Sequence, residues 1–365
     1  MSEKISHEPF FCFINKLKEE ERKTGNRHLL DFHFYNTTNI ALSISKAISD
    51  IDNRENGIKS KLIKSFLDIK YKKELSLNEK TKRFEQLVQL ISELSVLQCV
   101  CNIDWPAGST FEYEPKAPNG KRPEFKVETD NTIYLFEVKA PSLIDHKTKR
   151  TNNTFQMPYR HHSEIFENFK ELYGGVTLPK DNPIKDFLLS AQDKFSSFSK
   201  EKEVISILVV VWDSHMYEAT APLVNQFNGL LTENNWFGIE KIKDVDGVIV
   251  VNKMDYIIND LMSQHVTGIP GNIEIKQGDM PNVFAANVRG KKVPEFIISA
   301  FNSFDASHIK PEDWIGADYA PLDMVMWIQM PQIKKVSSEE FSNKIQIPYK
   351  QKLMVTTALT PLYLE

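Results

Sequence analysis

Residues 123–140 read Pro-Glu-Phe-Lys-Val-Glu-Thr-Asp-Asn-Thr-Ile-Tyr-Leu-Phe-Glu-Val-Lys-Ala, and this stretch decides the predicted fold. Two runs in which apolar side chains recur flank Asp130-Asn131, a dipeptide that suits a hairpin turn. We therefore expect strands over Glu124–Glu128 and Thr132–Ala140, joined as an antiparallel pair.

The second of these strands is apolar on both faces until its end, where Glu137 and Lys139 share one face. Pairing outward from the turn places Glu124 directly opposite Glu137, with Cβ atoms about 4.5–5.5 Å apart. Opposed carboxylates repel, so a site that holds them together either raises one pKa or places a cation between them. With a lysine beside them, they predict a site for Mg²⁺ or Mn²⁺. The alternative is a cross-strand ion pair between Glu137 and Lys139, with Glu124 solvated at an edge.

The chain on either side of the hairpin predicts a mixed α/β sheet flanked by helices. Thr38–Ile51 and Thr81–Val100 carry apolar residues at helical spacing. Ser109–Glu114 alternates as a third strand ahead of the hairpin, and Val204–Trp212 and Val248–Val251 are typical of buried strands. Helix, three-strand meander, helix, strand, helix and strand follow in that order, which favours one central sheet with helices on its faces.

Three regions follow from this order. We expect a helical N-terminal region over residues 1–80, a core over residues 81–255, and a C-terminal extension over residues 256–365. The sequence assigns no role to the extension and does not indicate whether it joins the sheet. Within the first region Gly57–Arg83 is basic, and it is either a solvated helix face or a surface that follows phosphates.

Composition excludes several classes of protein. The chain has 365 residues, a formal charge of -4, 41% apolar and 26% charged residues, which excludes wholesale disorder and fibrous repeats. Its longest apolar stretch, Val204–Trp212, is far shorter than the about 20 residues that cross a bilayer, so we expect no membrane association. Three cysteines, Cys12, Cys99 and Cys101, provide neither a disulfide framework nor a zinc set, which favours a reducing, cytoplasmic setting.

The same residues carry a resemblance to a known family. Pro123-Glu124 stands thirteen residues before Glu137-Val-Lys139 within a strand–turn–strand, and this resembles the PD-(D/E)XK nuclease superfamily, whose fold is restriction-endonuclease-like. The preceding helix contains Phe84-Glu85-Gln-Leu-Val-Gln-Leu-Ile, which is similar to the opening helix of Mrr-type restriction endonucleases. The resemblance covers about residues 81–252. The family's usual aspartate of the first motif is Glu124 here, a metal ligand with a longer side chain.

The resemblance implies a role for each residue of the motif. Glu124 and Glu137 would ligate the metal, and the Val138 carbonyl would complete its shell. Lys139 would position the attacking water and stabilise the charge that develops on the phosphate. Phosphodiester hydrolysis adds negative charge to an anionic group, and a divalent ion offsets that charge and lowers the pKa of its bound water.

Further candidates lie on the two flanking helices. In Mrr-type enzymes an acidic residue on the first helix often faces the metal, which points to Glu85, with Glu93 as its rival and a solvated glutamate as the ordinary alternative. Gln192 and Lys194 lie on the helix after the motif, where some relatives place site residues.

A basic rim surrounds the hairpin in the sequence. The basic residues that precede, line and follow it are Lys121, Arg122, Lys126, Lys147, Lys149, Arg150 and Arg160. Such a rim on a slightly acidic chain is typical of a cleft that binds nucleic acid.

We therefore expect an Mg²⁺-dependent endonuclease that acts on DNA, and the resemblance implies bacterial genome defence and a homo-oligomer that cuts both strands. Two alternatives remain at this point. The chain is a catalytically impaired nucleic-acid-binding or scaffold protein, which the glutamate at position 124 favours, or an effector that a regulatory partner protein activates. The sequence does not distinguish DNA from RNA, because that choice depends on loops and groove shape.

Overall fold

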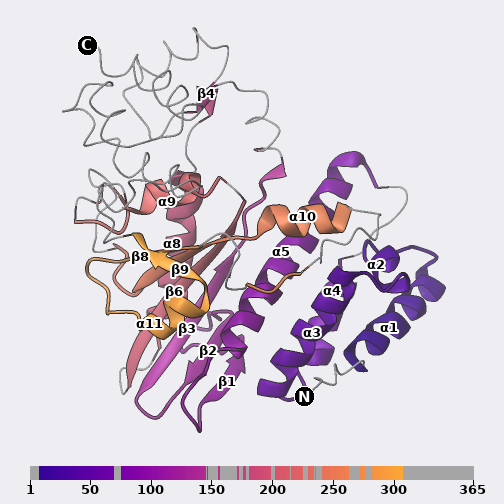
Figure 1. Ribbon diagram of the computed structural model, residues 1–365, viewed down its shortest axis with the longest axis horizontal. Helices are drawn as coiled ribbons and strands as arrows, with labels where there is room; N and C mark the ends of the chain where they lie inside the picture. Colours follow the sequence, from indigo (N-terminus) through magenta and orange to yellow (C-terminus); the bar gives the residue numbers. More distant parts are fainter. Residues whose placement is uncertain are drawn as a thin grey trace.

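Figure 1 shows the computed structural model of the chain. It describes residues 8–69, 75–144, 181–198, 202–213, 215–224, 241–262, 272–275 and 282–306, together with residues 146, 155–156, 171, 176–177, 229–233 and 235. The elements are, in chain order, α1 (Glu8–Thr24), α2 (Asp31–Tyr35), α3 (Asn39–Arg54), α4 (Lys59–Leu67), α5 (Leu77–Cys101), β1 (Thr110–Tyr113), β2 (Phe125–Glu128), β3 (Thr132–Lys139), β4 (Phe155–Gln156), β5 (Val176–Thr177), α8 (Asp181–Phe195), β6 (Glu203–Trp212), α9 (Tyr217–Val224), β7 (Gly247–Asn252), α10 (Met254–Met262), β8 (Asn282–Ala286), α11 (Glu295–Ala300) and β9 (Ser303–Asp305).

A seven-stranded mixed sheet forms the centre of the fold, in the order β1-β2-β3-β6-β7-β8-β9. Strands β1, β2 and β3 form an antiparallel meander, and β3, β6 and β7 run parallel. Strand β8 returns antiparallel to β7, and β9 lies parallel to β8 at the edge. The predicted mixed α/β sheet with flanking helices is confirmed. The sheet also continues past residue 255, because β8 and β9 come from the region that we expected to be an extension.

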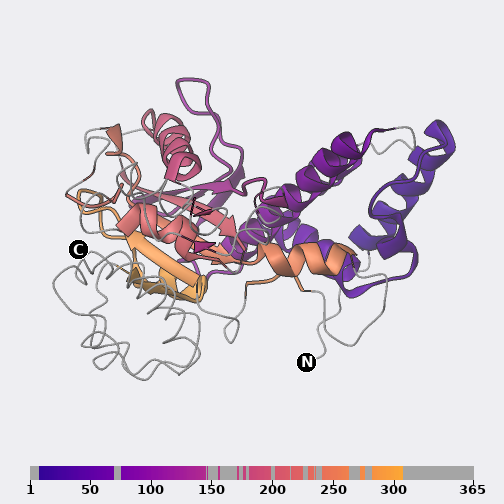
Figure 2. The ribbon, with the colours of Figure 1, turned by 90° about the horizontal axis from the view of Figure 1, so that it is seen from above.

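Helices α1–α4 pack against one another and against α5, on the side of α5 away from the sheet (Figures 1 and 2). Aromatic rings fill the space between them: the Phe13 ring stacks on Phe34 at 4.2 Å and meets Phe66 edge-on at 5.6 Å. Such pairs add about 0.5–1.5 kcal/mol beyond the burial of their area. The helices of the expected N-terminal region therefore enclose an apolar interior, which is continuous with the core of the sheet.

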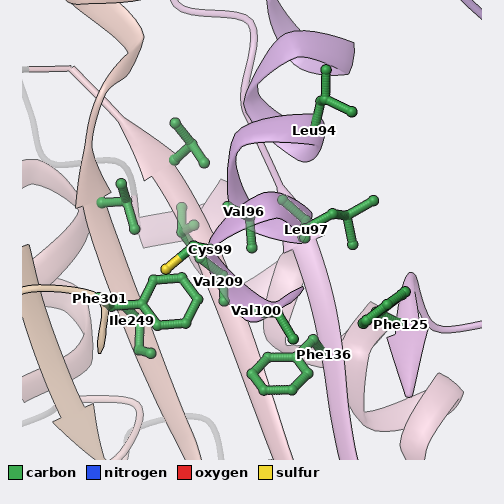
Figure 3. Close-up of a cluster of buried hydrophobic side chains, with 14 of the residues drawn as sticks. Leu94, Val96, Leu97, Cys99, Val100, Phe125, Phe136, Val209, Ile249 and Phe301 are labelled. Atoms are coloured by element: carbon green, nitrogen blue, oxygen red, sulfur yellow. The ribbon is translucent and has the colours of Figure 1, made fainter. Parts of the chain in front are cut away.

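Helix α5 links this bundle to the sheet. It begins at Leu77, four residues before the start that we predicted at Thr81, because Ser76 and Glu79 form a capping box ahead of the apolar stripe. Its last turns are buried on nearly every side, and Figure 3 shows Leu97 and Val100 packed with Phe136 and other apolar side chains of the sheet. This packing fixes α5 across one face of the meander.

The two faces of β3 meet different helices. Tyr134 and Phe136 point to the face where Trp105 and Phe296 of α11 lie, with ring centroids 4.9 Å apart for Trp105–Tyr134 and 6.3 Å for Tyr134–Phe296. Side chains alternate along a strand, so Glu137 points to the other face, which α8 covers (Figure 2). The candidate site therefore lies between β3 and α8.

Two further expectations concern the membrane and the cysteines. Within the described part of the chain, no helix combines the length and apolar character that a bilayer span requires. Cys12, Cys99 and Cys101 are all free thiols. Burial raises the pKa of the Cys99 thiol to about 12, so this side chain behaves as a small apolar residue at neutral pH.

Candidate functional site

The register of the β2–β3 hairpin brings the two glutamates together. Phe125 pairs with Phe136, and the turn closes where the Thr129 N–H donates to the Thr132 carbonyl at 2.9 Å, leaving Asp130-Asn131 as a two-residue turn. One position further from the turn than the Phe125–Phe136 pair, Glu124 therefore lies opposite Glu137. The predicted register is confirmed.

Glu137 is the most deeply placed charge of the site. Its side chain is 0% exposed, and its Oε1 lies 2.6 Å from the Lys139 Nζ and 2.6 Å from the Lys194 Nζ. The other oxygen, Oε2, is buried and has no hydrogen-bond partner among the described residues. A buried carboxylate oxygen without a donor is costly, so it marks a place where a cation or a water completes the site.

Glu124 completes a four-residue cluster of opposite charges, Glu124, Glu137, Lys139 and Lys194. Its Oε1 lies 3.5 Å from the Lys194 Nζ. Burial and the charge of Glu137 raise the pKa of the Glu124 carboxyl, whereas Lys194 and Lys139 oppose that rise. Burial alone would lower the pKa of Lys194, but the adjacent Glu137 and Glu124 carboxylates outweigh it and the pKa is raised. The Lys194 side chain is therefore an ammonium ion at neutral pH.

The acid that helix α5 brings nearest to this cluster is Glu93. It accepts a hydrogen bond from the Tyr113 hydroxyl at 3.0 Å. Burial, together with the negative charge of Glu124, raises the pKa of Glu93 to about 8. Glu85 lies eight residues earlier on the helix and accepts a hydrogen bond from the Ser142 hydroxyl, in the segment that follows β3. Between the two rival candidates, the electrostatic coupling to Glu124 therefore favours Glu93.

The predicted basic rim is largely neutralised where the structure describes it. Lys121 lies 2.9 Å from Asp193, and Lys126 lies 2.6 Å from Glu112. The Arg122 guanidinium lies 3.9 Å from Glu114. These cations already have carboxylate partners, which weakens their attraction for phosphate. Lys147, Lys149, Arg150 and Arg160 lie outside the described residues.

Of the two candidates on α8, only Lys194 reaches the cluster. Gln192 instead contacts Asp244: its Nε2 donates to the Asp244 carboxylate, and its Oε1 accepts from the Asp244 N–H at 2.7 Å. Gln192 thus fixes the end of α8 against the segment before β7 and holds Lys194 in place. The sequence offered both residues because they lie on the helix after the motif, but it could not say which one faces Glu137.

The residues of the cluster fit a hard divalent cation. Glu124 and Glu137 supply oxygen ligands from opposed strands, and the Glu137 Oε2 has no hydrogen-bond partner among the described residues. Burial, together with the neighbouring carboxylates, raises the pKa values of Glu124 and Glu93, and a cation would relieve the repulsion among these carboxylates. In the described ranges no three His, Cys, Asp or Glu side chains lie close enough to hold a metal alone. Backbone oxygen, such as the Val138 carbonyl, and water would therefore complete the shell.

The raised pKa of Glu93 predicts a pH dependence of stability. The pKa of this carboxyl is about 8 in the folded protein and about 4.5 in the unfolded chain, so the folded protein keeps the proton to higher pH. The contribution of Glu93 to the free energy of unfolding therefore falls as the pH rises from 4.5 to 8. We expect the Glu93→Gln variant to melt above the wild type at about pH 9 and close to it at about pH 5. Calorimetric Tm values at both pH values check this. Glu85→Gln, on the same helix, is the control, and an equal pH response in both variants would contradict the assignment.

No protein-family model, curated protein or solved structure matches this chain. The cluster of Glu124, Glu137, Lys139 and Lys194 is therefore what supports a functional proposal.

Proposed function

We propose that this protein is a metal-dependent nuclease that hydrolyses phosphodiester bonds of DNA, with the arrangement of residues that the PD-(D/E)XK superfamily uses. The observation that carries the proposal is the pair of opposed carboxylates, with Glu137 0% and Glu124 17% exposed, a lysine two residues beyond Glu137, and a Glu137 oxygen that has no hydrogen-bond partner among the described residues. The resemblance of the hairpin motif supports the same class, and it implies bacterial genome defence in the cytoplasm.

The chemistry divides among the chain's own side chains. Glu124 and Glu137 would hold Mg²⁺ or Mn²⁺, and the bound ion supplies charge compensation for the phosphate and a water of lowered pKa. The Lys139 side chain is 24% exposed and lies beside the Glu137 carboxylate. From there it can orient a water and donate to a phosphate oxygen. Lys194 contacts the same carboxylate oxygen from α8. It supplies a second positive charge next to the expected position of the phosphate.

Partners follow from the same proposal. DNA is the macromolecular substrate, and a homo-oligomer would place two such sites on opposite strands. A regulatory protein partner fits the N-terminal bundle of α1–α4, which packs on α5 away from the sheet (Figure 1).

One observation favours a second candidate, a nucleic-acid-binding or scaffold protein with an impaired site. The Lys194 ammonium contacts Glu137 at 2.6 Å and approaches Glu124 at 3.5 Å, so together with Lys139 it balances both carboxylates without a metal. In that case the cluster is a buried ion network that stabilises the contact between α8 and β3.

Metal binding separates the two candidates. We expect Mn²⁺ or Mg²⁺ at millimolar concentration to raise the Tm of the wild type by a few degrees, since a ligand bound only by the folded state stabilises it. The Glu137→Gln variant should lose this shift, whereas Glu128→Gln, a surface acid of the same hairpin, should keep it. Differential scanning fluorimetry against EDTA checks this, and no metal-dependent shift in the wild type would favour the impaired site.

A further inference from the structure

A second site lies along the same face of the sheet. A groove of about 600 Å³ opens at the amino ends of β6 and β7. Val204 and Ser206 line it, and they share a strand face with Leu208, the partner of Glu137. Phe195, directly after Lys194, and Phe198 line it as well. The groove therefore neighbours the candidate active site across the end of α8, but it contains none of the cluster residues.

Four cations of the described residues line this groove, and two of them have no partner within this part of the chain. Lys202 contacts Glu128 at 2.9 Å, and the Lys291 Nζ donates to the Val204 carbonyl. The Lys243 ammonium and the Arg289 guanidinium make no ion pair or hydrogen bond with any described residue, and both side chains are exposed. A guanidinium and an ammonium left free beside one concavity are typical of a site that takes an anion.

The two aspartates of the groove do not cancel these charges at its surface. Asp246 is buried and accepts from the Ser206 N–H at 2.7 Å and from the Lys291 N–H at 2.6 Å. Asp244 accepts from Gln192. Both carboxylates are thus occupied by donors of the chain. Glu203 is the acid that stays exposed, at the first position of β6.

The segment that carries the free Arg289 is held in place by its neighbours. Asn287 donates to the Ile242 and Val245 carbonyls, both at 2.8 Å, and its own N–H donates to the Asp246 carbonyl. A Cβ at Gly290 would lie 2.7 Å from the Asp246 Cα, so this backbone approach requires glycine. The turn therefore holds the Arg289 backbone at the groove before any ligand arrives, which lowers the entropic cost of ordering this segment on binding.

We propose that this groove binds the phosphate group of a nucleotide unit, with Arg289 and Lys243 as the phosphate ligands. The Phe198 ring, partly buried in the wall, offers an apolar surface on which a base can pack. The volume falls in the range of about 300–1,000 Å³ that small-molecule sites occupy. A free nucleotide and a nucleotide unit of a nucleic acid present the same chemistry to these residues, so the experiment has to distinguish the two sources.

The test measures binding by the full chain in EDTA, so it does not depend on cleavage. The probes are inorganic pyrophosphate, a nucleoside triphosphate and a short labelled oligodeoxynucleotide, followed by calorimetry and fluorescence anisotropy. We expect the Lys243→Gln/Arg289→Gln double variant to bind roughly tenfold more weakly or worse, because two charge-assisted contacts are lost. The control double variant, Lys18→Gln/Lys292→Gln, removes the same charge from exposed lysines outside the groove and should stay within about twofold of the wild type.

The three probes distinguish the two sources of the phosphate group. Saturable binding of pyrophosphate and the triphosphate assigns the groove to a free nucleotide, and binding of the oligodeoxynucleotide alone assigns it to a nucleic acid backbone. Absence of binding by the folded wild type to all three probes would overturn the inference, as would an equal loss in the control variant. A chain that binds here and never cuts DNA would overturn the nuclease proposal alone.

Discussion

Replacing Glu137 by glutamine is expected to lower metal-dependent DNA cleavage by roughly a thousandfold, because the site loses its most buried ligand charge. Glutamine keeps the shape of the side chain, so the packing between β3 and α8 is retained. Lys139 and Lys194 are 24% and 19% exposed, and they can turn toward water once the carboxylate is gone. Initial cleavage rates in Mg²⁺ at matched protein concentration measure the effect, and far-UV circular dichroism reports the fold.

The matched control for this variant is Glu128→Gln. Glu128 lies on the neighbouring strand of the same hairpin and pairs with Lys202 and Lys126 at the surface, 31% exposed. Surface pairs of this kind contribute about 0–1 kcal/mol, so cleavage should stay within about twofold of the wild type. Equal losses in both variants would assign the effect to the hairpin as a whole and not to the Glu137 carboxylate.

Replacing Lys139 by methionine is expected to lower cleavage by roughly a hundredfold or more, in the range that a positioned proton donor or charge contributes. The affinity for the metal ion should not fall with the cleavage rate and is expected to stay equal or to rise. Lys139 and Lys194 both contact the Glu137 Oε1, so removing one ammonium leaves more negative charge for the cation. The variant should therefore bind Mn²⁺ at least as tightly as the wild type, which calorimetric titration measures.

This pairing of lost cleavage with retained metal binding is what distinguishes a lysine that acts on water and phosphate from one that only stabilises the fold. Lys126→Met is the control, because Lys126 lies on the same hairpin but pairs with Glu112 at 2.6 Å. A Lys139→Met variant that cleaves DNA at the rate of the wild type would contradict the role assigned to this side chain.

The hairpin could be predicted from the sequence because its determinants are local. The Asp130-Asn131 dipeptide sets the turn, and period-2 alternation sets which side chains share a face, so the opposition of Glu124 and Glu137 follows. The buried strands β6 and β7 were also recognisable, as short apolar runs.

The contributions of Glu93 and Lys194 could not be fixed in the same way. An amphipathic pattern identifies the buried stripe of α5, but it does not fix where along the axis the helix passes Glu124, so residues eight positions apart remained rivals. The position of Lys194 depends on how α8 packs on β3, which is a tertiary contact. The strands β8 and β9, five and three residues long, offered too little pattern to detect.

The partners of the predicted basic rim could not be predicted from the sequence either. Lys121 and Lys126 stand out along the chain, but their partners Asp193 and Glu112 come from α8 and β1 and neutralise them only in the fold. By contrast, Lys243 and Arg289 lie far apart in the sequence and meet at one groove. Charge counted along the chain therefore does not reveal which cations have carboxylate partners, because ion pairs form in space.

The measurement that tests the central claim most directly is cleavage of covalently closed circular DNA by the wild type, Glu137→Gln and Lys139→Met, each in Mg²⁺, Mn²⁺ and EDTA. The account predicts nicked or linear product only with the wild type and only with a divalent ion. Cleavage that persists in EDTA, or metal-dependent cleavage that both variants retain at the rate of the wild type, would contradict a nuclease site built on Glu137 and Lys139.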